Sequence, residues 1–520
     1  MPDTVDRLLR LRASDYPLKP AVIDPTTRIG YGELDSTTMD LAATFVEAGV
    51  GKGTRVGLLA PNGVRWVQLA LALTRIGAVL VPLSTLLQPR ELMAQLRVAS
   101  VTYLVSVDEF RGHRYVEEIR TELRVSDLDR SVVQHPELPA LRQVWTCEAL
   151  TTMPGAPSSV VRELAAGVSP SDPLVVMFTS GSSGMPKGVI HSHGNALSAV
   201  RSSLEPRCID ADTRLYLPMP FFWVGGFGSG VLSVLVAGAT LVTEPSPHPA
   251  ATLRLLERER VTLFRGWPDQ AEALAREASS IGADLSALQP GSLDALLAPE
   301  HRGRPGARVN LFGMTEAFGP YCGYRADTDM PESAWGSCGK PFPGMEVRIV
   351  DVDDGAPVAA GTTGQIQIRG PNTLRGICRR SREDLFTVDG FYPTGDLGHL
   401  DDDGFLFYHG RSDDMFKVSG ATVYPSEVER ALRTIDGVRG AFVTNVPTEQ
   451  GDRVGAVVVC DASATPVAVR AAAKAVLSAF KVPTVWVLLD SDDAVPRGST
   501  GKVDVGRLRK MLSASDTLGP

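Results

Sequence analysis

The sequence has little of what marks several common protein classes. Its six cysteines form no Cys-x-x-Cys pair and no zinc-binding spacing, so neither a disulfide scaffold nor a zinc module is expected. No apolar run is long enough to span a bilayer, and the first residues lack the uninterrupted apolar core of a signal peptide. We therefore expect a reduced, cytoplasmic protein, and peripheral membrane contact stays open.

The chain also has no dense run of lysine and arginine. It carries 52 basic and 60 acidic side chains, a formal net charge of −8. Because binding to a long polyanion requires a basic stripe, nucleic acid is not an expected partner. This mild acidity fits a protein that handles small anions in one local site.

What the chain does contain is typical of a globular protein with a sizeable core. Of its 520 residues 43% are apolar and 22% charged, and its 50 glycines and 37 prolines follow no fixed period. This composition excludes disordered and collagen-like chains. At roughly 150 residues per domain, the length suggests about three folding units.

The first part of the chain alternates strand-like and helical patterns. Residues 55–59 and 78–82 read as short apolar strands, and residues 64–76 between them read as a helix. A strand, helix, strand order of this kind predicts a parallel sheet covered by helices on both faces. A further helix is expected within residues 33–50.

The pattern changes after about residue 340. Residues 345–350 and 365–369 alternate with period two, which indicates a smaller β-rich section. Beyond residue 410 helices and strands alternate in a compact α+β unit, where Ser426 and Glu429 fit a capping box. We expect a large α/β N-terminal domain, residues 1–410, and a small α+β C-terminal domain, residues 411–520.

The strongest chemical signal is a loop rich in glycine and serine at residues 179–187. The loop follows an apolar strand and ends in a Pro-Lys pair. A flexible Gly/Ser linker is the alternative, but such linkers rarely follow a buried strand or contain a Pro-Lys pair. Its backbone N–H groups, the hydroxyls of Thr179 and three serines, and the cation of Lys187 could together hold a triphosphate. The P-loop pattern G-x-x-x-x-G-K-[ST] does not occur in the chain.

This loop resembles the phosphate loop of the adenylate-forming superfamily, which includes acyl-CoA synthetases, adenylation domains and luciferases. Four more segments resemble motifs of that superfamily in the same order: Asn-Leu-Phe-Gly-Met-Thr-Glu at 310–316, Tyr-Pro-Thr-Gly-Asp at 392–396, Gly-Arg-Ser-Asp-Asp at 410–414, and Pro-Arg-Gly-Ser-Thr-Gly-Lys at 496–502. Each alone is a common turn or surface sequence. Five in register identify the chain as similar to the acyl-CoA synthetase branch.

The resemblance implies a role for each matched residue. Phe312 would stack on adenine, Thr315 would bind the α-phosphate, and Glu316 would bind Mg²⁺, a cation that prefers carboxylate oxygens. The Asp396 carboxylate would accept both ribose hydroxyls, and Arg411 would reach the ribose. The full implied ATP and AMP site comprises Thr179, Ser180, Gly181, Ser182, Ser183, Gly184, Lys187, Phe312, Gly313, Met314, Thr315, Asp396, Arg411 and Lys502.

The C-terminal matches imply movement between two half-reactions. The implied catalytic residues are Lys502, Thr315 and Glu316. Of these, Lys502 would bridge the acid and the α-phosphate during adenylation. The small domain would then rotate as a mobile lid about Asp413. This rotation would bring Lys417 and Gly420 to the active site, where they would take part in thioester formation with coenzyme A.

The chain departs from the family pattern around the acid. Residues 220–226 place aromatic side chains where histidine is common, and Thr422 stands where a larger polar residue often follows the hinge glycine. The family's Gly/Ala-rich loop is not recognisable. The aromatic stretch lacks the Asp that holds an α-ammonium group. The expected acid is therefore bulky and apolar, not an α-amino acid, in a pocket formed by Phe222, Trp223, Gly225, Gly226 and Phe318. Core packing explains these five equally well.

The leading interpretation is an ATP-dependent acyl-CoA ligase that uses ATP, Mg²⁺, coenzyme A and a small carboxylic acid. Three alternatives stay open: thioester formation from a supplied acyl-adenylate, loading of a separate carrier-protein thiol, and a degenerate nucleotide-binding regulator. A homodimer is equally left open. His191 and His193 have no third metal ligand nearby in the sequence, so packing is favoured for both.

Overall fold

The computed structural model describes residues 3–125, 135–179, 186–309, 311–412, 416–418, 421–448, 451–461, 464–477, 481–498 and 502–516. The chain forms two compact units. The larger comprises Met1–Val347, Ile368–Tyr392 and Gly404–Leu406, and the smaller comprises Arg348–Gln367, Pro393–Asp403 and Phe407–Pro520. The expected combination of a large α/β domain and a smaller C-terminal domain is confirmed.

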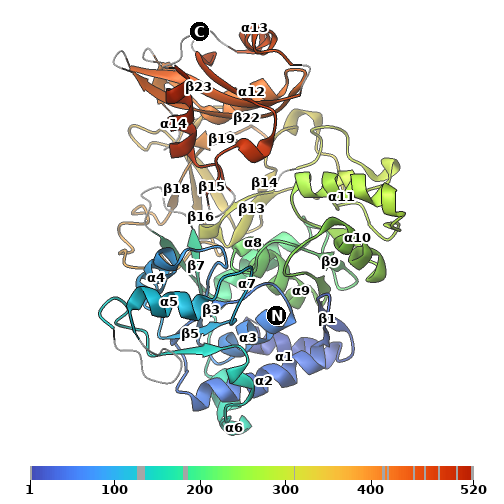
Figure 1. Ribbon diagram of the computed structural model, residues 1–520, viewed down its shortest axis with the longest axis vertical. Helices are drawn as coiled ribbons and strands as arrows, with labels where there is room; N and C mark the ends of the chain where they lie inside the picture. Colours follow the sequence, from blue (N-terminus) through green and yellow to red (C-terminus); the bar gives the residue numbers. More distant parts are fainter. Residues whose placement is uncertain are drawn as a thin grey trace. The chain divides into compact units, whose positions relative to one another are not determined.

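The larger unit is built on a seven-stranded sheet. Strands β3 (Arg55–Leu59) and β4 (Val79–Pro82) are parallel neighbours joined by helix α3 (Val64–Arg75), which confirms the predicted strand–helix–strand unit. The full order is β17-β8-β7-β4-β3-β5-β6, and the bounds of the other five strands are β5 Tyr103–Ser106, β6 Gln143–Thr146, β7 Pro173–Thr179, β8 Lys187–Ser192 and β17 Gly376–Ile377. The flanking helices include α2 (Tyr31–Glu47), α4 (Pro89–Val98) and α5 (Tyr115–Leu123) (Figure 1).

A second sheet of the same unit has the order β11-β9-β10-β1-β2. Its strands are β1 (Pro20–Ile23), β2 (Arg28–Gly30), β9 (Arg214–Tyr216), β10 (Thr240–Val242) and β11 (Leu263–Phe264). Helices α10 (Pro249–Arg258) and α11 (Pro268–Ile281) bury their apolar residues against it. Because β1, β9, β10 and β11 are parallel, their carboxyl ends lie at one edge, where parallel sheets usually bind ligands.

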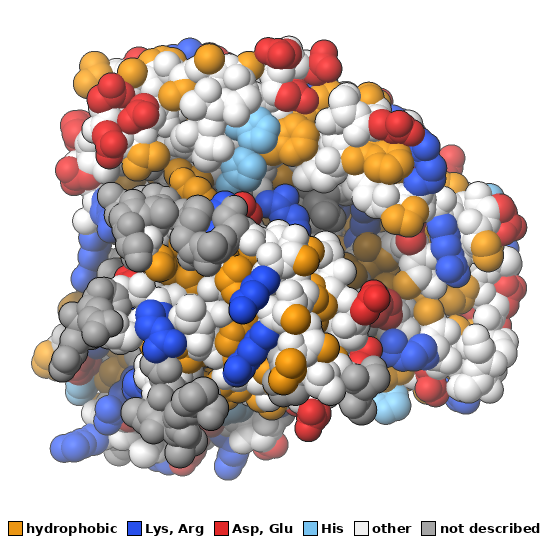
Figure 2. Space-filling view, turned by 90° about the horizontal axis from the view of Figure 1, so that it is seen from above, with side chains coloured by type: hydrophobic (Ala, Val, Ile, Leu, Met, Phe, Trp, Pro, Cys, Tyr) orange, Lys and Arg blue, Asp and Glu red, His pale blue; other side chains and the backbone are white. Residues whose placement is uncertain are grey.

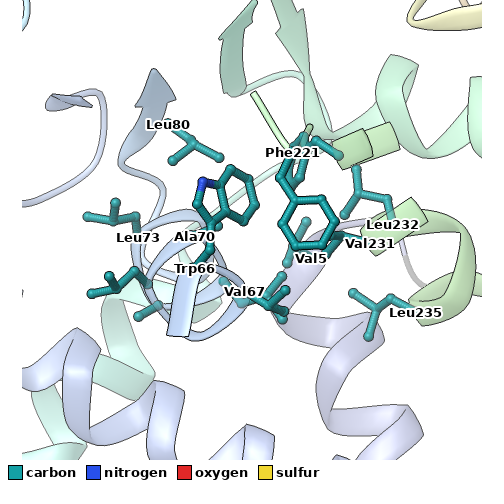
Figure 3. Packing of buried hydrophobic residues seen from close by; sticks show 14 of the residues in the cluster. Val5, Trp66, Val67, Ala70, Leu73, Leu80, Phe221, Val231, Leu232 and Leu235 are labelled. Carbon is teal, nitrogen blue, oxygen red and sulfur yellow. The ribbon is translucent and has the colours of Figure 1, made fainter. Parts of the chain in front are cut away.

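The main core lies between α3 and the segment that precedes β10. The Trp66 ring is buried, 5.1 Å from the ring of Phe221 and 5.7 Å from that of Phe227. Figure 3 shows apolar side chains from α1 (Val5–Asp15), α3 and the 231–235 segment closing around this aromatic group. Each fully buried side chain of this size stabilises the fold by roughly 1.5–3 kcal/mol relative to exposure.

Most strands in the described part of the smaller unit belong to two sheets with different patterns. A four-stranded sheet, whose residues belong mostly to this unit, has the order β15-β16-β18-β19, with bounds Glu346–Val350, Gly364–Arg369, Tyr392–Leu400 and Leu406–Arg411. A three-stranded sheet follows, with β22 (Val438–Thr448), β23 (Gly451–Cys460) and β24 (Val485–Leu489). Helices α12 (Pro425–Arg433), α13 (Pro466–Val476) and α14 (Val505–Asp516) complete the α+β arrangement.

The predicted capping box at Ser426 and Glu429 is wrong. Helix α12 begins at Pro425, so Ser426 lies inside its first turn and donates its hydroxyl to the His409 carbonyl. Glu429 Oε1 instead accepts the backbone N–H of Val443 at 2.9 Å. Proline fixes φ near the helical value and needs no N–H partner, which favours it as the first helical residue.

None of the helices in the described part of the chain has both the length and the apolar character needed to cross a membrane. On the face drawn in Figure 2, both acidic and basic side chains reach the surface.

A fully buried arginine joins the first three helices. Arg75 donates to Asp6 Oδ1 from Nε at 3.1 Å and from Nη2 at 2.8 Å, and its Nη2 reaches Asp35 Oδ1 at 2.9 Å. Its Nη1 donates to the hydroxyl of Thr38 at 2.7 Å. Since Asp6 is also buried, the pair is stable only while both partners are present.

We expect Arg75→Met to lower the free energy of unfolding by about 3–5 kcal/mol, because it leaves the Asp6 carboxylate buried without its cation. The measurement is urea unfolding of the full chain. The matched control is Arg7→Met, since Arg7 is half exposed and pairs with the exposed Asp3; it is expected to change stability by less than about 1 kcal/mol. Equal stabilities for the two variants would contradict the role of Arg75.

Candidate functional site

The predicted phosphate loop connects two antiparallel strands of the central sheet. Thr179, the last residue of β7, is the register partner of Lys187, the first residue of β8. The hairpin therefore closes the base of the loop and fixes where Lys187 emerges. The predicted loop residues between them lie outside the described part of the structure: Ser180, Gly181, Ser182, Ser183 and Gly184.

Lys187 meets a carboxylate and a phenol at this point. Its Nζ donates to Glu316 Oε1 and, at 3.0 Å, to the hydroxyl of Tyr392. The Tyr392 hydroxyl donates in turn to Glu316 Oε1 at 3.4 Å. Only 22% of the Lys187 side chain and 8% of the Glu316 side chain are exposed, so solvent screens this ion pair weakly. We call these three residues the Lys187 cluster.

The protonation states in the Lys187 cluster follow from burial and charge. Burial acts to lower the pKa of Lys187, but the attraction of Glu316 and hydrogen bonds to Glu316 and Tyr392 outweigh it and raise that pKa. Burial, and then the negative charge of Glu316, raise the pKa of Tyr392. At neutral pH the cluster therefore holds an ammonium group and a neutral phenol.

A tight hairpin positions Thr315 and Glu316. Strands β12 (Phe312–Met314) and β13 (Gly319–Gly323) are antiparallel, and a Cβ on Gly313 would lie 2.2 Å from the Gly319 carbonyl oxygen. Any larger residue at position 313 would force the strands apart. The Glu316 carbonyl also accepts the Leu374 N–H at 2.8 Å, which anchors the turn to the segment before β17.

His191 supports the same turn, although the sequence favoured simple packing for it. Its Nε2 donates to the Thr315 carbonyl at 2.7 Å, and its Nδ1 accepts from Asn195 Nδ2 at 2.6 Å. Burial lowers the pKa of His191 to about 4, so the ring is neutral and this pattern of one donor and one acceptor is fixed. His191 thereby couples β8 to the Thr-Glu segment. Its only sequence signal is its place four residues before Asn195, which is too common to identify it.

His193 fits the packing prediction better. It is buried at the start of helix α7 (His193–Leu204), and its Nδ1 accepts the backbone N–H of Val5 at 3.3 Å. Burial lowers the pKa of His193 to about 4 as well.

The smaller unit brings two predicted ribose contacts together. Arg411 Nη1 donates to Asp396 Oδ1 at 3.2 Å and to the Thr394 carbonyl at 3.0 Å. Gly395 between them has φ 76°, and a Cβ there would lie 2.9 Å from Arg411 Nη2. Glycine is therefore needed at this position for both conformation and space. The arrangement leaves a buried carboxylate already oriented by a cation.

The remaining C-terminal predictions are described in part. Lys502 is exposed in a loop closed by hydrogen bonds from Gly498 N to the Lys502 carbonyl at 2.8 Å and from Asp504 N to the Pro496 carbonyl at 2.9 Å. The backbone of Lys417 pairs with Thr422. Asp413, Gly420 and the Lys417 side chain lie outside the described residues.

The predicted acid-pocket residues all belong to the larger unit. Phe222 is buried and meets Trp223 edge to face at 5.6 Å. Phe318 is buried against His191, with ring centroids 4.8 Å apart. The two glycines are packed: a Cβ on Gly225 would lie 2.8 Å from a sulfur of Met219, and one on Gly226 would lie 2.1 Å from a carbonyl oxygen.

The described residues contain no group of three or more His, Cys, Asp or Glu side chains placed to hold a metal ion. Mg²⁺ is usually held by one or two carboxylates together with substrate phosphates. Glu316 supplies one such carboxylate beside the phosphate loop. The donor set therefore fits a magnesium ion that arrives with a nucleotide.

Sequence comparison connects this geometry to known proteins. A family model described as AMP-binding enzyme matches residues 9–378. A 3-[(3aS,4S,7aS)-7a-methyl-1,5-dioxo-octahydro-1H-inden-4-yl]propanoyl:CoA ligase of Mycobacterium tuberculosis is 31% identical, with 98% of each chain covered. A 3-hydroxybenzoate–CoA ligase of Aromatoleum is 32% identical, with 95% of this chain and 94% of the relative covered.

Solved structures share the fold over nearly the whole chain. ATP-bound MatB from Rhodopseudomonas palustris superimposes with a TM-score of 0.78 at 25% identity, covering 99% of both chains. The anthranilate CoA ligase AuaEII with anthranoyl-AMP superimposes with a TM-score of 0.80 at 22% identity, covering 99% of this chain and 98% of the other.

The two buried histidines predict acid lability. Since their pKa in the folded state lies near 4, below the unfolded value of 6.5, the unfolded chain binds more protons between these values. Stability is therefore complete above pH 6.5 and falls as the pH drops toward 4, by up to about 3 kcal/mol per histidine.

This expectation is tested by urea unfolding at several pH values from 7.5 to 4.5, for the unmodified protein and for His191→Gln and His193→Gln. Each substitution removes one titrating ring, so each should flatten the decline of stability with falling pH, whatever its effect at pH 7.5. Parallel pH profiles for all three proteins would contradict it.

Proposed function

This chain belongs to the AMP-binding enzyme family, in its acyl-CoA ligase branch, and from that membership we propose that it activates a bulky, largely apolar carboxylic acid as an acyl-adenylate and transfers it to coenzyme A. The membership confirms the resemblance drawn from the five motifs. The observation that carries the proposal is the Lys187 cluster, a buried cation and carboxylate at the exit of the predicted phosphate loop.

The Lys187 cluster suits the arrival of a nucleotide. Without ATP, Glu316 neutralises Lys187 inside the protein. When ATP binds, its phosphates offer Lys187 new anionic partners, while Glu316 becomes available to Mg²⁺, whose bound ion would offset the phosphate charge. The exchange keeps every charge compensated, so binding costs little reorganisation of the protein. The Tyr392 hydroxyl stays within reach of both side chains and holds them in place.

The adenylation step needs positioning more than covalent help from the protein. A carboxylate attacks the α-phosphate weakly because both carry negative charge. In our proposal Thr315 binds the α-phosphate, and His191 supports this by fixing the Thr315 carbonyl and hence the turn. Phe312 stacks on adenine, and Asp396, oriented by Arg411, accepts the ribose hydroxyls. Lys502 bridges the acid and the α-phosphate, and its positive charge stabilises the negative charge that develops there in the transition state.

The thioester step requires a thiol to reach the carbonyl that Lys502 covers during adenylation. We propose that residues 411–520 act as a lid on residues 1–410. The lid would rotate about Asp413, so that Lys502 leaves and Lys417 and Gly420 approach the pantetheine arm. Hinge rotation of a small domain is a common way to separate two steps at one site.

Two features support the proposed class of acid. The aromatic stretch that includes Phe222 and Trp223 carries no carboxylate for an α-ammonium group. Two relatives with nearly equal identity to this chain are a ligase for a bicyclic propanoate and a ligase for a hydroxybenzoate. Both of these acids contain a ring. The proposed substrate is therefore a ring-bearing acid rather than an amino acid.

The function is tested by incubating the protein with ATP, Mg²⁺, coenzyme A and a panel of aromatic, alicyclic and long-chain acids, and measuring pyrophosphate and acyl-CoA separately. Both products are expected with ring-bearing acids. Pyrophosphate without acyl-CoA would favour a carrier-protein acceptor. Acyl-CoA formed only from a supplied acyl-adenylate would favour the thioester-only alternative, and no product at all would contradict the proposal.

We expect Lys502→Ala to reduce adenylation by at least about 100-fold and to leave thioester formation from preformed acyl-adenylate nearly unchanged, because the lysine acts only while charge develops at the α-phosphate. The control is Lys510→Ala, an exposed lysine on α14, which should leave both half-reactions intact. Equal loss in the two half-reactions would remove the proposed role of Lys502.

A further inference from the structure

Two arginines lie where the second sheet meets the predicted acid pocket. Arg265 directly follows β11, at the carboxyl edge of the parallel strands. Arg207 follows helix α7 and is only 3% exposed. Arg265 Nη2 donates to the Arg207 carbonyl at 3.1 Å, so the two residues are in direct contact.

Neither arginine has a carboxylate partner among the residues that the structure describes. Arg207 uses its guanidinium to bind the Ser233 hydroxyl at 2.8 Å and the Ser229 carbonyl at 2.5 Å. Asp327 attracts Arg265 through space, but both of its carboxylate oxygens accept from Arg325, at 3.0 and 2.6 Å. The positive charges of Arg207 and Arg265 are thus left without a direct counter-charge.

Two buried polar atoms at this place, Arg265 Nε and Gln270 Oε1, have no hydrogen-bond partner among the residues that the structure describes. Gln270 lies over the backbone just after Arg265, since a Cβ on Gly266 would come within 2.9 Å of its Oε1. Each unpaired buried polar atom costs about 1–3 kcal/mol, and rotation of the Gln270 amide would present a donor in place of the acceptor.

The arginine pair is connected to the predicted acid pocket through shared walls. Trp267, two residues after Arg265, meets Trp223 edge to face at 6.3 Å. On the other side Arg207 holds the Ser229 carbonyl, and the Ser229 hydroxyl lies 3.9 Å from where a Cβ on Gly319 would be. Gly319 follows Phe318 in the turn after Glu316. Both arginines are therefore linked by short contacts to residues of the predicted acid pocket.

Both arginines stay charged at neutral pH despite their surroundings. Burial, with the neighbouring Arg265 adding to it, lowers the pKa of Arg207 to about 9, and burial also lowers the pKa of Arg265. Two like charges in a weakly solvated place are costly unless an anion joins them. A bound carboxylate would satisfy the free Nε and compensate the charge in one step, since arginine binds carboxylates in a fixed fork.

We propose that Arg265, supported by Arg207, binds a second anionic group, in the first place a carboxylate, at the far end of the acid substrate, so that the enzyme prefers dicarboxylic acids with an apolar body. The inference rests on the proposed function, because it concerns the acid that this site activates. Arg265 is the specificity-determining residue, and Arg207 positions it.

The test uses three acids with one apolar body: cyclohexylpropanoic acid, the same acid with a second carboxylate on the ring, and the same acid with a ring ketone. We expect kcat/KM for the diacid to exceed those for the other two by on the order of 100-fold, mostly through KM. Arg265→Met should remove this preference by weakening use of the diacid, and Arg265→Lys should keep part of it. Arg276→Met, an exposed arginine on α11, is the matched control and should leave the preference intact.

The outcomes separate this inference from the proposed function. If the monoacid and keto acid are activated as well as the diacid, and Arg265→Met leaves the ratio unchanged, the second anionic site is refuted while the ligase activity stands. If no acid yields acyl-CoA, the proposed function fails. Thermal stabilisation by the diacid in the presence of AMP then still decides the site, since it should occur in the unmodified protein and not in Arg265→Met.

Discussion

The ion pair of Lys187 and Glu316 is the constraint on which the site depends. The two residues are 129 positions apart in sequence, and Tyr392 lies a further 76 along, yet all three meet at one oxygen atom. A largely buried ammonium group without its carboxylate would be destabilising, so charge compensation holds the strand that begins at Lys187 to the Thr-Glu turn. The Tyr392 hydroxyl joins the start of β18 to this pair by hydrogen bonds. The same charges that stabilise the unliganded protein are the ones a magnesium–nucleotide complex would use.

The backbone behind this ion pair is also constrained. The Thr315 carbonyl accepts two donors, His191 Nε2 at 2.7 Å and the Phe318 N–H at 3.0 Å. Phe318 adopts a left-handed conformation with φ 53°, which costs about 1–2 kcal/mol for a residue with a side chain. The two hydrogen bonds to the Thr315 carbonyl and the packing of Phe318 against His191 offset this cost. A turn held in this way presents Thr315 and Glu316 with little freedom, as a binding site for charged phosphates requires.

The sequence predicts those features that residues close together in the chain determine, and it does not predict contacts between residues far apart in the chain. The strand–helix–strand unit around α3 is read correctly because periodicity and turn residues within 30 positions determine it. The capping box at Ser426 fails because the helix begins at Pro425, two residues earlier than a cap at Ser426 would place it. The order of the five motifs identifies Lys187 and Glu316 by resemblance. It gives no signal for His191, whose partners are a backbone carbonyl 124 residues away and the common residue Asn195.

Buried cations in this protein differ in what compensates them, and that difference separates structure from recognition. Arg75 is enclosed by two carboxylates from two other helices, so the fold alone accounts for it. Lys187 has one carboxylate partner in the described part of the chain, and in our proposal the phosphates of a nucleotide take the place of that partner. Among the described residues, Arg265 has a carbonyl as the hydrogen-bond partner of one nitrogen, and its Nε has none. An apolar side chain of similar length would pack there without the desolvation cost of the guanidinium group, which its one hydrogen bond to a carbonyl offsets only in part. Its presence is explained by an anion that comes and goes, and in a ligase for carboxylic acids the substrate is the natural source of one.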